Sequence, residues 1–336
     1  MMRLTRFTCF VFLGTLLGIS ARSQTPSEPA VFRLDVRLVT VDAQVLSKKT
    51  GRAINTLQRQ DFQLYEDGVP QPITSFSQDG LPLSVVFLFD LTDSVRPVLK
   101  SLAGGALQAL QHLKPEDEVA VMVYSASAQL LQDFTSDREL AAAAIEKASK
   151  MESYEAAFFN EGVFQAAVQS AKSRNPSSRR VVLWMTDDVP NIPSDALPLR
   201  YRRSISFDKL HTKTQATTEL LKTGTVVYTL LRMSEISIAE SFRGSSRTVD
   251  AMLHPPGDVY QYSEQTGGHV IEASQKQMAS KLADWIDALR ARYTLGYRPP
   301  QSTTKAKFRK IEVKVSPEIK EREGKIFVEA KRGYYR

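Results

Sequence analysis

The chain has 336 residues, with 44 Lys and Arg against 37 Asp and Glu and a formal net charge of +7. Its single cysteine, Cys9, excludes a disulfide framework, a zinc–thiolate site and a cysteine nucleophile in the rest of the chain. The basic residues are densest in 301–336 and at Arg200, Arg202 and Arg203, without a recognition motif for nucleic acid. We interpret them as solvated strand faces and loops, the alternative being a surface for an anionic envelope.

The first segment in chain order is typical of a secretory signal peptide. Arg3 and Arg6 precede an apolar stretch over 7–19, and Ala21-Arg22-Ser23 places small residues where signal peptidase reads them. The apolar core of about 13 residues is shorter than the roughly 20 that cross a bilayer. We therefore expect residues 1–23 to be removed. The mature protein is then exported, periplasmic or secreted, without a transmembrane segment.

Both flanks of the remaining chain alternate apolar and polar residues, as β-strands do. In the amino-terminal segment, 24–79, the alternation starts at Phe32, and turns are predicted at 48–51 and 66–68. The carboxyl-terminal segment, 299–336, shows two further strands, 310–315 and 325–330, around a turn at Glu323-Gly324. Because an isolated hairpin is only marginally stable, we expect 32–77 and the carboxyl-terminal segment to pack together as one small β domain.

Residues 80–298 alternate predicted strands with predicted helices, which is typical of a doubly wound, mostly parallel α/β sheet. Two stretches rich in Pro, Ser, Arg and Gly, 188–211 and 234–259, each follow a strand, and we expect them to be either partner-binding loops or mobile segments. The predicted strands are 84–89, 118–124, 129–134, 179–186 and 225–231, and the predicted helices are 95–113, 138–150, 161–173, 212–222 and 276–293.

Two of these strands end in acidic residues. One apolar run ends in Asp90, with Thr92 and Ser94 at alternate positions after it, and another ends in Asp187-Asp188. In open α/β sheets, ligands bind at the carboxyl ends of the strands. Carboxylate and hydroxyl oxygens are the ligands that Mg²⁺ prefers. The sequence therefore predicts a divalent cation, Mg²⁺ or alternatively Mn²⁺ or Ca²⁺, at this edge of the sheet.

A structural role for the same residues is the alternative. Asp, Ser and Thr are preferred at helix N-caps, so Asp90 and Asp187 also suit helix starts. Two buried aspartates side by side without a cation would, however, repel one another. The coincidence of two acidic strand ends therefore favours the metal.

The order DLTDS after one strand and TDD after a later one resembles the metal-ion-dependent adhesion site of von Willebrand factor type A domains. In that family Asp-x-Ser-x-Ser is followed by a distant Thr and then by an Asp. On this resemblance Asp90, Thr92 and Ser94 match the first group, with Thr in place of the first Ser, and Asp187 matches the last Asp.

The distant Thr of that pattern is missing, and Glu161 is the best-aligned residue at its place, with Asn160 next to it. A third carboxylate would lower the positive charge that the ion presents to an acidic ligand. The resemblance thus implies a degenerate site, with Glu161 as a fifth candidate ligand. Such a site binds metal more readily than it binds a carboxylate of a partner.

The flanks extend the resemblance. The segments DFQLYEDG at 61–68 and YTLGYRP at 293–299 resemble those of exported, acidobacterial von Willebrand factor A-related proteins. This resemblance implies an exported protein that binds or adheres to a protein partner in a metal-dependent way. A metal-independent envelope scaffold with a vestigial site is the alternative.

Enzymatic activity is the main rival class, and we expect none. The four histidines are too scattered for a metal-ligand spacing, and no HExxH, GxSxG or phosphate-loop motif occurs. Asp90 and Asp187 around Mg²⁺ would suit metal-assisted hydrolysis. Phosphatases of the haloacid dehalogenase type, however, need Asp-x-Asp after the first strand, where this chain has Asp-x-Thr-Asp.

Overall fold

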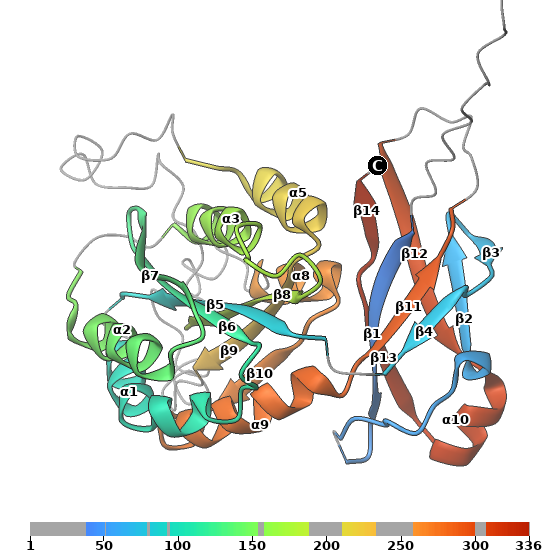
Figure 1. The fold of residues 1–336 in the computed structure, drawn as a ribbon, viewed down its shortest axis with the longest axis horizontal. Coiled ribbons are helices and arrows are strands. Elements are labelled where there is room, and N and C mark those ends of the chain that lie inside the picture. Colours follow the sequence, from blue (N-terminus) through green and yellow to red (C-terminus); the bar gives the residue numbers. More distant parts are fainter. Residues whose placement is uncertain are drawn as a thin grey trace, which may run out of the picture. The chain divides into compact units, whose positions relative to one another are not determined.

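The computed structural model describes residues 38–50, 52–78, 81–92, 95–153, 158–187, 210–232, 258–299 and 307–335. They form one six-stranded sheet covered by helices and two four-stranded sheets (Figure 1). The predicted signal peptide, Ser94, Asp188, the Arg200–203 cluster and most of the two predicted loops lie outside the described residues. Among the described residues, no helix combines the length and the apolar character that crossing a membrane requires.

The six-stranded sheet has the strand order β10-β9-β8-β5-β6-β7, in which only β7 is antiparallel to its neighbour. This arrangement confirms the predicted α/β class with a mostly parallel sheet. The strands β5 and β6 are buried along their whole length, which explains their continuous apolar sequences. The strands are β5 (Leu83–Asp90), β6 (Glu118–Tyr124), β7 (Ala128–Thr135), β8 (Arg179–Thr186), β9 (Val226–Arg232) and β10 (Val270–Ala273).

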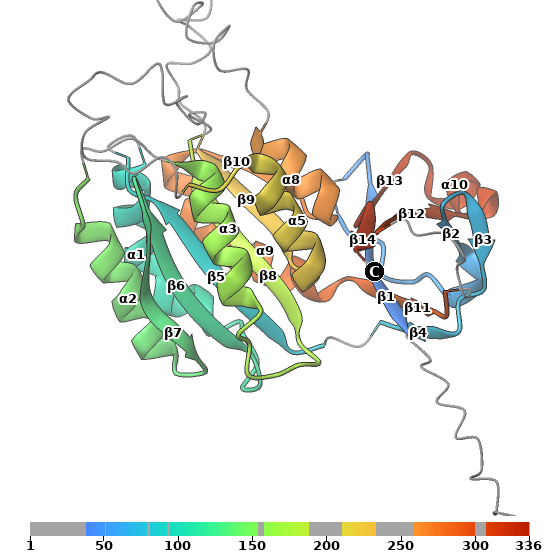
Figure 2. The same ribbon diagram turned by 90° about the horizontal axis from the view of Figure 1, so that it is seen from above.

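Helices cover both faces of this sheet. One face packs against α1 (Arg96–Leu110), α2 (Arg138–Lys150) and α9 (Met278–Arg290). The other face packs against α3 (Phe159–Ser170), α5 (Lys213–Thr223) and α8 (Asp258–Thr266). Figure 2 shows α3 and α5 running alongside the strands that they cover. The carboxyl ends of β5 and β8 thus emerge at one edge, between two helical layers.

The two four-stranded sheets join both flanks of the chain. Their orders are β13-β1-β11-β4 and β14-β12-β2-β3. Amino-terminal β1 and β2 pair with carboxyl-terminal β13 and β12, respectively, as predicted for one β domain built from both ends. The elements are β1 (Val39–Ser47), β2 (Phe62–Glu66), β3 (Val69–Gln71), β4 (Ser75–Ser77), β11 (Tyr293–Tyr297), β12 (Phe308–Val315), α10 (Pro317–Glu323), β13 (Ile326–Ala330) and β14 (Gly333–Tyr335).

Three predicted helices, 95–113, 161–173 and 276–293, ended three residues too late, and the last of them ran into a strand. The predicted helix 276–293 ends at Arg290, and Tyr293 is instead the first residue of β11. The tyrosine is fully buried, and its hydroxyl donates to the carbonyl oxygen of Ile54 at 2.8 Å and accepts from the amide of Leu57 at 3.0 Å. Its apolar ring continued the helical pattern in sequence, but tertiary contacts with the amino-terminal flank place it in a strand.

The two flank motifs meet in the core of the β domain. The Tyr297 hydroxyl, from YTLGY, donates to Oε2 of Glu66, from EDG, at 2.5 Å. Asp67 follows with a φ of 50° and Gly68 with a φ of 81°, so the chain turns sharply there. Asp67 Oδ1 then accepts from the amide of Lys310 at 2.9 Å. Contacts of the two motifs therefore link the amino-terminal flank to strands β11 and β12 from the carboxyl-terminal part of the chain.

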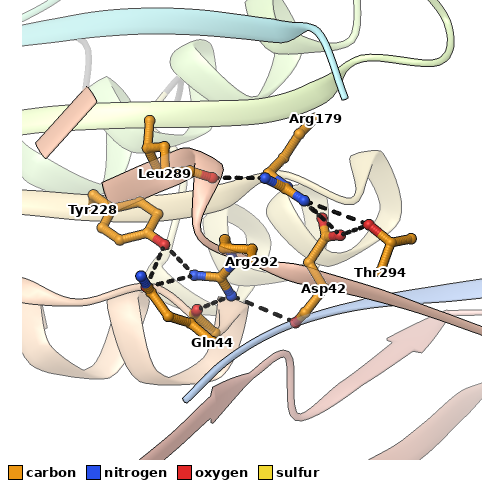
Figure 3. Close-up of polar contacts among 8 residues, drawn as sticks. Asp42, Gln44, Arg179, Tyr228, Leu289, Arg292 and Thr294 are labelled. Atoms are coloured by element: carbon orange, nitrogen blue, oxygen red, sulfur yellow. Dashed lines mark hydrogen bonds and ion pairs between the residues drawn. The ribbon is translucent and has the colours of Figure 1, made fainter. Parts of the chain in front are cut away.

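A network of buried charges connects the β domain with the six-stranded sheet (Figure 3). Arg179, at the start of β8, donates through Nε and Nη2 to the carboxylate of Asp42 on β1, at 3.1 and 3.3 Å. Its Nη1 donates to the carbonyl oxygen of Leu289 at 2.7 Å. Fully buried Arg292 donates to Tyr228 Oη and, at 2.8 Å, to the carbonyl oxygen of Gly267. Burial opposes the ionisation of Asp42, but Arg179 and Arg292 hold its pKa below the usual value.

The turn at 267–269 makes a second connection. Gly267 has a φ of 80°, and a Cβ there would lie 2.4 Å from backbone atoms of Ala330 and Lys331. Two residues further on, Nδ1 of His269 lies 2.8 Å from Oε1 of Glu329, and the two side chains form an ion pair when the imidazole is protonated. Glu329 raises the pKa of this histidine. The turn can therefore approach β13 closely only with glycine at 267, and it carries a titratable contact.

We expect the contact of His269 to make stability depend on pH. A raised folded pKa means that the stabilisation is complete below the unfolded value of about 6.5 and is lost as the pH rises through the folded value. Wild type should thus exceed His269→Gln in Tm at about pH 6 and lose this advantage by about pH 8. Because the imidazole is 44% exposed, the effect should stay below about 1 kcal/mol. A Tm difference that is constant with pH would contradict the expectation.

Candidate metal centre

The two acidic strand ends lie together. β5 and β8 are adjacent and parallel, with Phe89 opposite Met185, so Asp90 and Asp187 leave the same edge of the sheet. The Asp90 side chain is completely buried. Its Oδ1 accepts from the amide of Thr92 at 2.9 Å, and its Oδ2 accepts from the hydroxyl of Thr186 at 3.1 Å. Three of the predicted ligands, Asp90, Thr92 and Asp187, are therefore neighbours at this edge, and the fourth, Ser94, lies outside the described residues.

The electrostatics of this edge suit a cation. Burial, and secondarily the charge of Asp187, raise the pKa of Asp90 to about 6. Two carboxylates beside one another disfavour their joint ionisation, and a divalent cation would reverse that effect. Two carboxylates with hydroxyl groups form a hard oxygen donor set, which fits Mg²⁺ or Ca²⁺. Among the described residues, no group of three His, Cys, Asp or Glu side chains forms a metal cluster, at this edge or elsewhere, so a cation here would depend on hydroxyl oxygens beside the two carboxylates.

Glu161, the fifth predicted ligand, is engaged by a histidine. It lies in the first turn of α3, with Oε2 2.7 Å from Nδ1 of His211 and 3.1 Å from the amide of the same residue. Its Oε1 accepts from Gln165 Nε2 at 2.9 Å. The His211 ring stacks on Phe164 with centroids 3.4 Å apart. The Glu161 carboxylate thus contacts Gln165 on α3 and His211 just before α5, and the contact with His211 joins the start of α5 to α3.

The neighbouring candidate, Asn160, also has a partner. Its Oδ1 accepts from the hydroxyl of Tyr262 on α8 at 2.8 Å. The amide side chain therefore links α3 to α8 on the same face of the sheet.

Tyr124 is a site residue that sequence reasoning missed. It ends β6, directly opposite Asp90 in register, and its hydroxyl donates to Asp90 Oδ2 at 3.0 Å. Trp184 Nε1 donates in turn to the Tyr124 hydroxyl at 2.9 Å. A Cβ on Gly162 would lie 2.7 Å from the Tyr124 ring, so α3 packs directly on this tyrosine. The available signal was its position as the last residue of the strand next to the one ending in Asp90.

Comparison with known proteins identifies the segment that carries this site. Residues 85–189 match the model of the von Willebrand factor type A domain. The matched segment runs from β5 to just beyond β8 and contains Asp90, Thr92, Ser94, Glu161 and Asp187. No curated protein matches the chain in sequence.

Several solved structures are similar to this chain at low sequence identity. BatB from Bacteroides thetaiotaomicron is 14% identical, with 62% of this chain and 98% of that chain covered and a TM-score of 0.42. The domain of the type V pili tip protein Mfa5 from Porphyromonas gingivalis is 13% identical, with 62% and 95% covered and a TM-score of 0.40. Proximal thread matrix protein 1 from the mussel byssus, also described with a zinc-occupied metal site, is 14% identical, with 67% and 49% covered and a TM-score of 0.42. This chain spans about half the length of the mussel protein.

Proposed function

We propose that this protein, whose residues 85–189 belong to the von Willebrand factor type A domain family, binds a protein partner through a divalent cation at the carboxyl ends of β5 and β8. The observation that carries the proposal is the pair of carboxylates there, with Asp90 completely buried and Asp187 at the neighbouring strand end. Asp90, Thr92, Ser94 and Asp187 would hold the ion, for which we propose Mg²⁺. When bound, the ion supplies a positive charge at the protein surface for an acidic group of the partner.

The contacts of Glu161 support an ion that keeps much of its charge. Because Glu161 Oε2 lies 2.7 Å from His211 Nδ1, its carboxylate has a partner other than the ion. The ion would then meet two carboxylates instead of three. A partner carboxylate would find a stronger positive charge than the degenerate sequence pattern suggests.

We further propose that the protein is exported by way of residues 1–23 and acts by binding rather than by catalysis. The predicted signal peptide and the lack of a catalytic motif in the sequence support these two points.

One observation favours a second candidate function, a metal-independent scaffold. Asp90 accepts hydrogen bonds from Thr92, Tyr124 and Thr186, so its carboxylate has protein donors even without an ion. On this alternative the strand ends are a structural junction, and partners bind elsewhere.

Calorimetric titration with Mg²⁺ distinguishes the two functions. In metal-free mature protein, we expect Asp90→Asn to weaken Mg²⁺ binding about 100-fold or more, because the ion loses a close carboxylate in a buried setting. Asp284→Asn, at an aspartate on α9 whose side chain is 72% exposed, is the matched control and should bind like wild type. Equal titrations for wild type and Asp90→Asn would reject the metal centre and leave the scaffold.

Tryptophan fluorescence gives a second measurement. The chain has two tryptophans, and Trp184 reaches Asp90 through one tyrosine hydroxyl. In a Trp285→Phe background, Mg²⁺ should therefore change the emission of Trp184, with the same midpoint as the calorimetric titration. The change should be absent in the Asp90→Asn variant of that background.

A further inference from the structure

A polar pocket lies at the opposite edge of the six-stranded sheet from the candidate metal centre. It has a volume of about 470 Å³ and is formed where the amino-terminal ends of β8 and β9 meet strands of the β domain. This volume is within the range of small-molecule sites, about 300–1,000 Å³. The cationic side chains in its lining are those of Arg179, Arg180 and Lys331, and exposed hydroxyl residues in the lining include Thr40, Ser75 and Ser177.

The charges in this lining do not balance. Asp42 is the carboxylate among the lining residues, and Arg179 takes both of its oxygens. Arg292 approaches the same carboxylate and lowers its pKa further. Asp42 is thus fully compensated within the network of buried charges. Arg180 and Lys331 remain as an excess of positive charge.

Neither of these two cations has a complete set of partners. Arg180 Nη1 donates to the carbonyl oxygen of Thr223 at 2.9 Å, but its buried Nε has no hydrogen-bond partner among the described residues. Within the same residues, Lys331 Nζ forms no hydrogen bond or ion pair, and its aromatic neighbour is the Tyr334 ring at 5.9 Å. Burial lowers the pKa of Lys331, and the charge of Asp42, whose two oxygens are bonded to Arg179, opposes this shift only in part. A half-buried cation without a direct hydrogen-bond partner costs free energy, which a bound anion would offset.

We propose that this pocket, hereafter the anion pocket, binds a small oxyanion, a phosphate or carboxylate group, between Lys331 and Arg180. The oxyanion would accept from Lys331 Nζ and from the Arg180 guanidinium, and the exposed hydroxyls of Thr40, Ser75 and Ser177 would hydrogen-bond to the polar body of a larger solute. Lys331 follows β13 of the β domain and Arg180 is on β8. The anion therefore bridges the two domains and stabilises their contact.

Calorimetry and thermal unfolding of the mature, metal-free chain test this proposal. The probes are inorganic phosphate and citrate, titrated separately at constant ionic strength set with sodium chloride. We expect saturable binding of at least one probe and a rise in Tm with its concentration. The probe that binds more tightly identifies phosphate or carboxylate as the preferred group.

Three variants locate the binding. Lys331→Met and Arg180→Gln should each weaken binding about tenfold or more, since each removes a charged donor. Lys147→Met makes the same change of charge at an exposed lysine of α2, outside the pocket lining, and should bind like wild type. Without anion, Lys331→Met should unfold at or above the Tm of wild type, because it removes an unpaired cation.

Weaker binding in either pocket variant, with Lys147→Met unchanged, supports the anion pocket, and Arg180→Gln keeps the test valid if Lys331→Met does not fold. A folded wild type that binds neither probe would overturn the proposal. Equal affinities in wild type and all three variants would also overturn it. The same holds if Lys147→Met weakens binding as much as the two pocket variants do. The metal titration is independent, so failure here leaves the proposed cation site untouched.

Discussion

Arg179→Met is expected to lower the free energy of unfolding by about 3 kcal/mol, near the lower end of the range for a broken buried ion pair, because the substitution leaves Asp42 without the cation that contacts both of its oxygens. The Arg179 side chain is 1% exposed. Its guanidinium contacts Asp42 on β1, which precedes the α/β domain in sequence, and the carbonyl oxygen of Leu289, which lies near the end of that domain. The substitution leaves the Asp42 carboxylate with Arg292 and Thr294 as its remaining partners. Urea denaturation, monitored by circular dichroism, measures the loss.

A double-mutant cycle shows whether the loss comes from the stranded charge. Asp42→Asn combined with Arg179→Met removes both charges, and it should recover part of the stability that Arg179→Met loses. Arg332→Met is a matched control, since the Arg332 side chain is 65% exposed in its ion pair with Glu264. It should cost less than about 1 kcal/mol. A similarly small cost for Arg179→Met would mean that the buried network does not hold the domains together.

Deleting residues 310–336 is expected to unfold the β domain. The deletion removes most of β12 and all of β13 and β14, which pair with β2, β1 and β12 in the two four-stranded sheets. It also removes the buried side chains of Ile311, Val313, Val315 and Ile319. At about 1.5–3 kcal/mol for each buried aliphatic side chain, the lost burial is comparable with the whole stability of a typical domain, about 5–15 kcal/mol.

Limited proteolysis measures this effect. Cleavage within 61–68, which contains β2 and the turn after it, should become much faster in the deleted chain. Single substitutions give a matched pair for the same test: Val313→Asp, at a site 9% exposed, should accelerate cleavage, and Phe327→Asp, at a site 46% exposed, should not. Unchanged cleavage in the deleted chain would show that the amino-terminal flank folds without the carboxyl-terminal one.

The sequence was most informative where one face or both faces of an element are buried. The continuous apolar run of β5 and the strict alternation of β12 each have one structural explanation, and both strands were predicted within a residue or two of where they occur. Short or polar elements were missed: β10 has four residues, and α10 buries Ile319 as the one apolar side chain of its sequence PEIKERE. Such elements form because neighbours are already in place, which a local pattern does not record.

Only part of the candidate site could be predicted from the sequence. Asp90 and Asp187 could be predicted because each lies at the carboxyl end of a buried strand, and the parallel pairing of β5 with β8 then brings them together. The link from Trp184 through Tyr124 to Asp90 could not be predicted, because it depends on which strand lies beside which. The same holds for Glu161 and His211, which are 50 positions apart and meet through the packing of α5 on α3.

The place of β11 has a consequence for the order of folding. Thr294 on β11 pairs with Ser77 on β4, and between them in sequence lies the entire six-stranded sheet with its helices. Closing such a long segment costs conformational entropy that few strand contacts offset, and contacts between distant residues form slowly. Once the α/β domain has folded, its two ends lie next to each other, and most of that entropy has already been lost. The α/β domain should therefore fold first, and the β domain should assemble afterwards around the ends that it brings together.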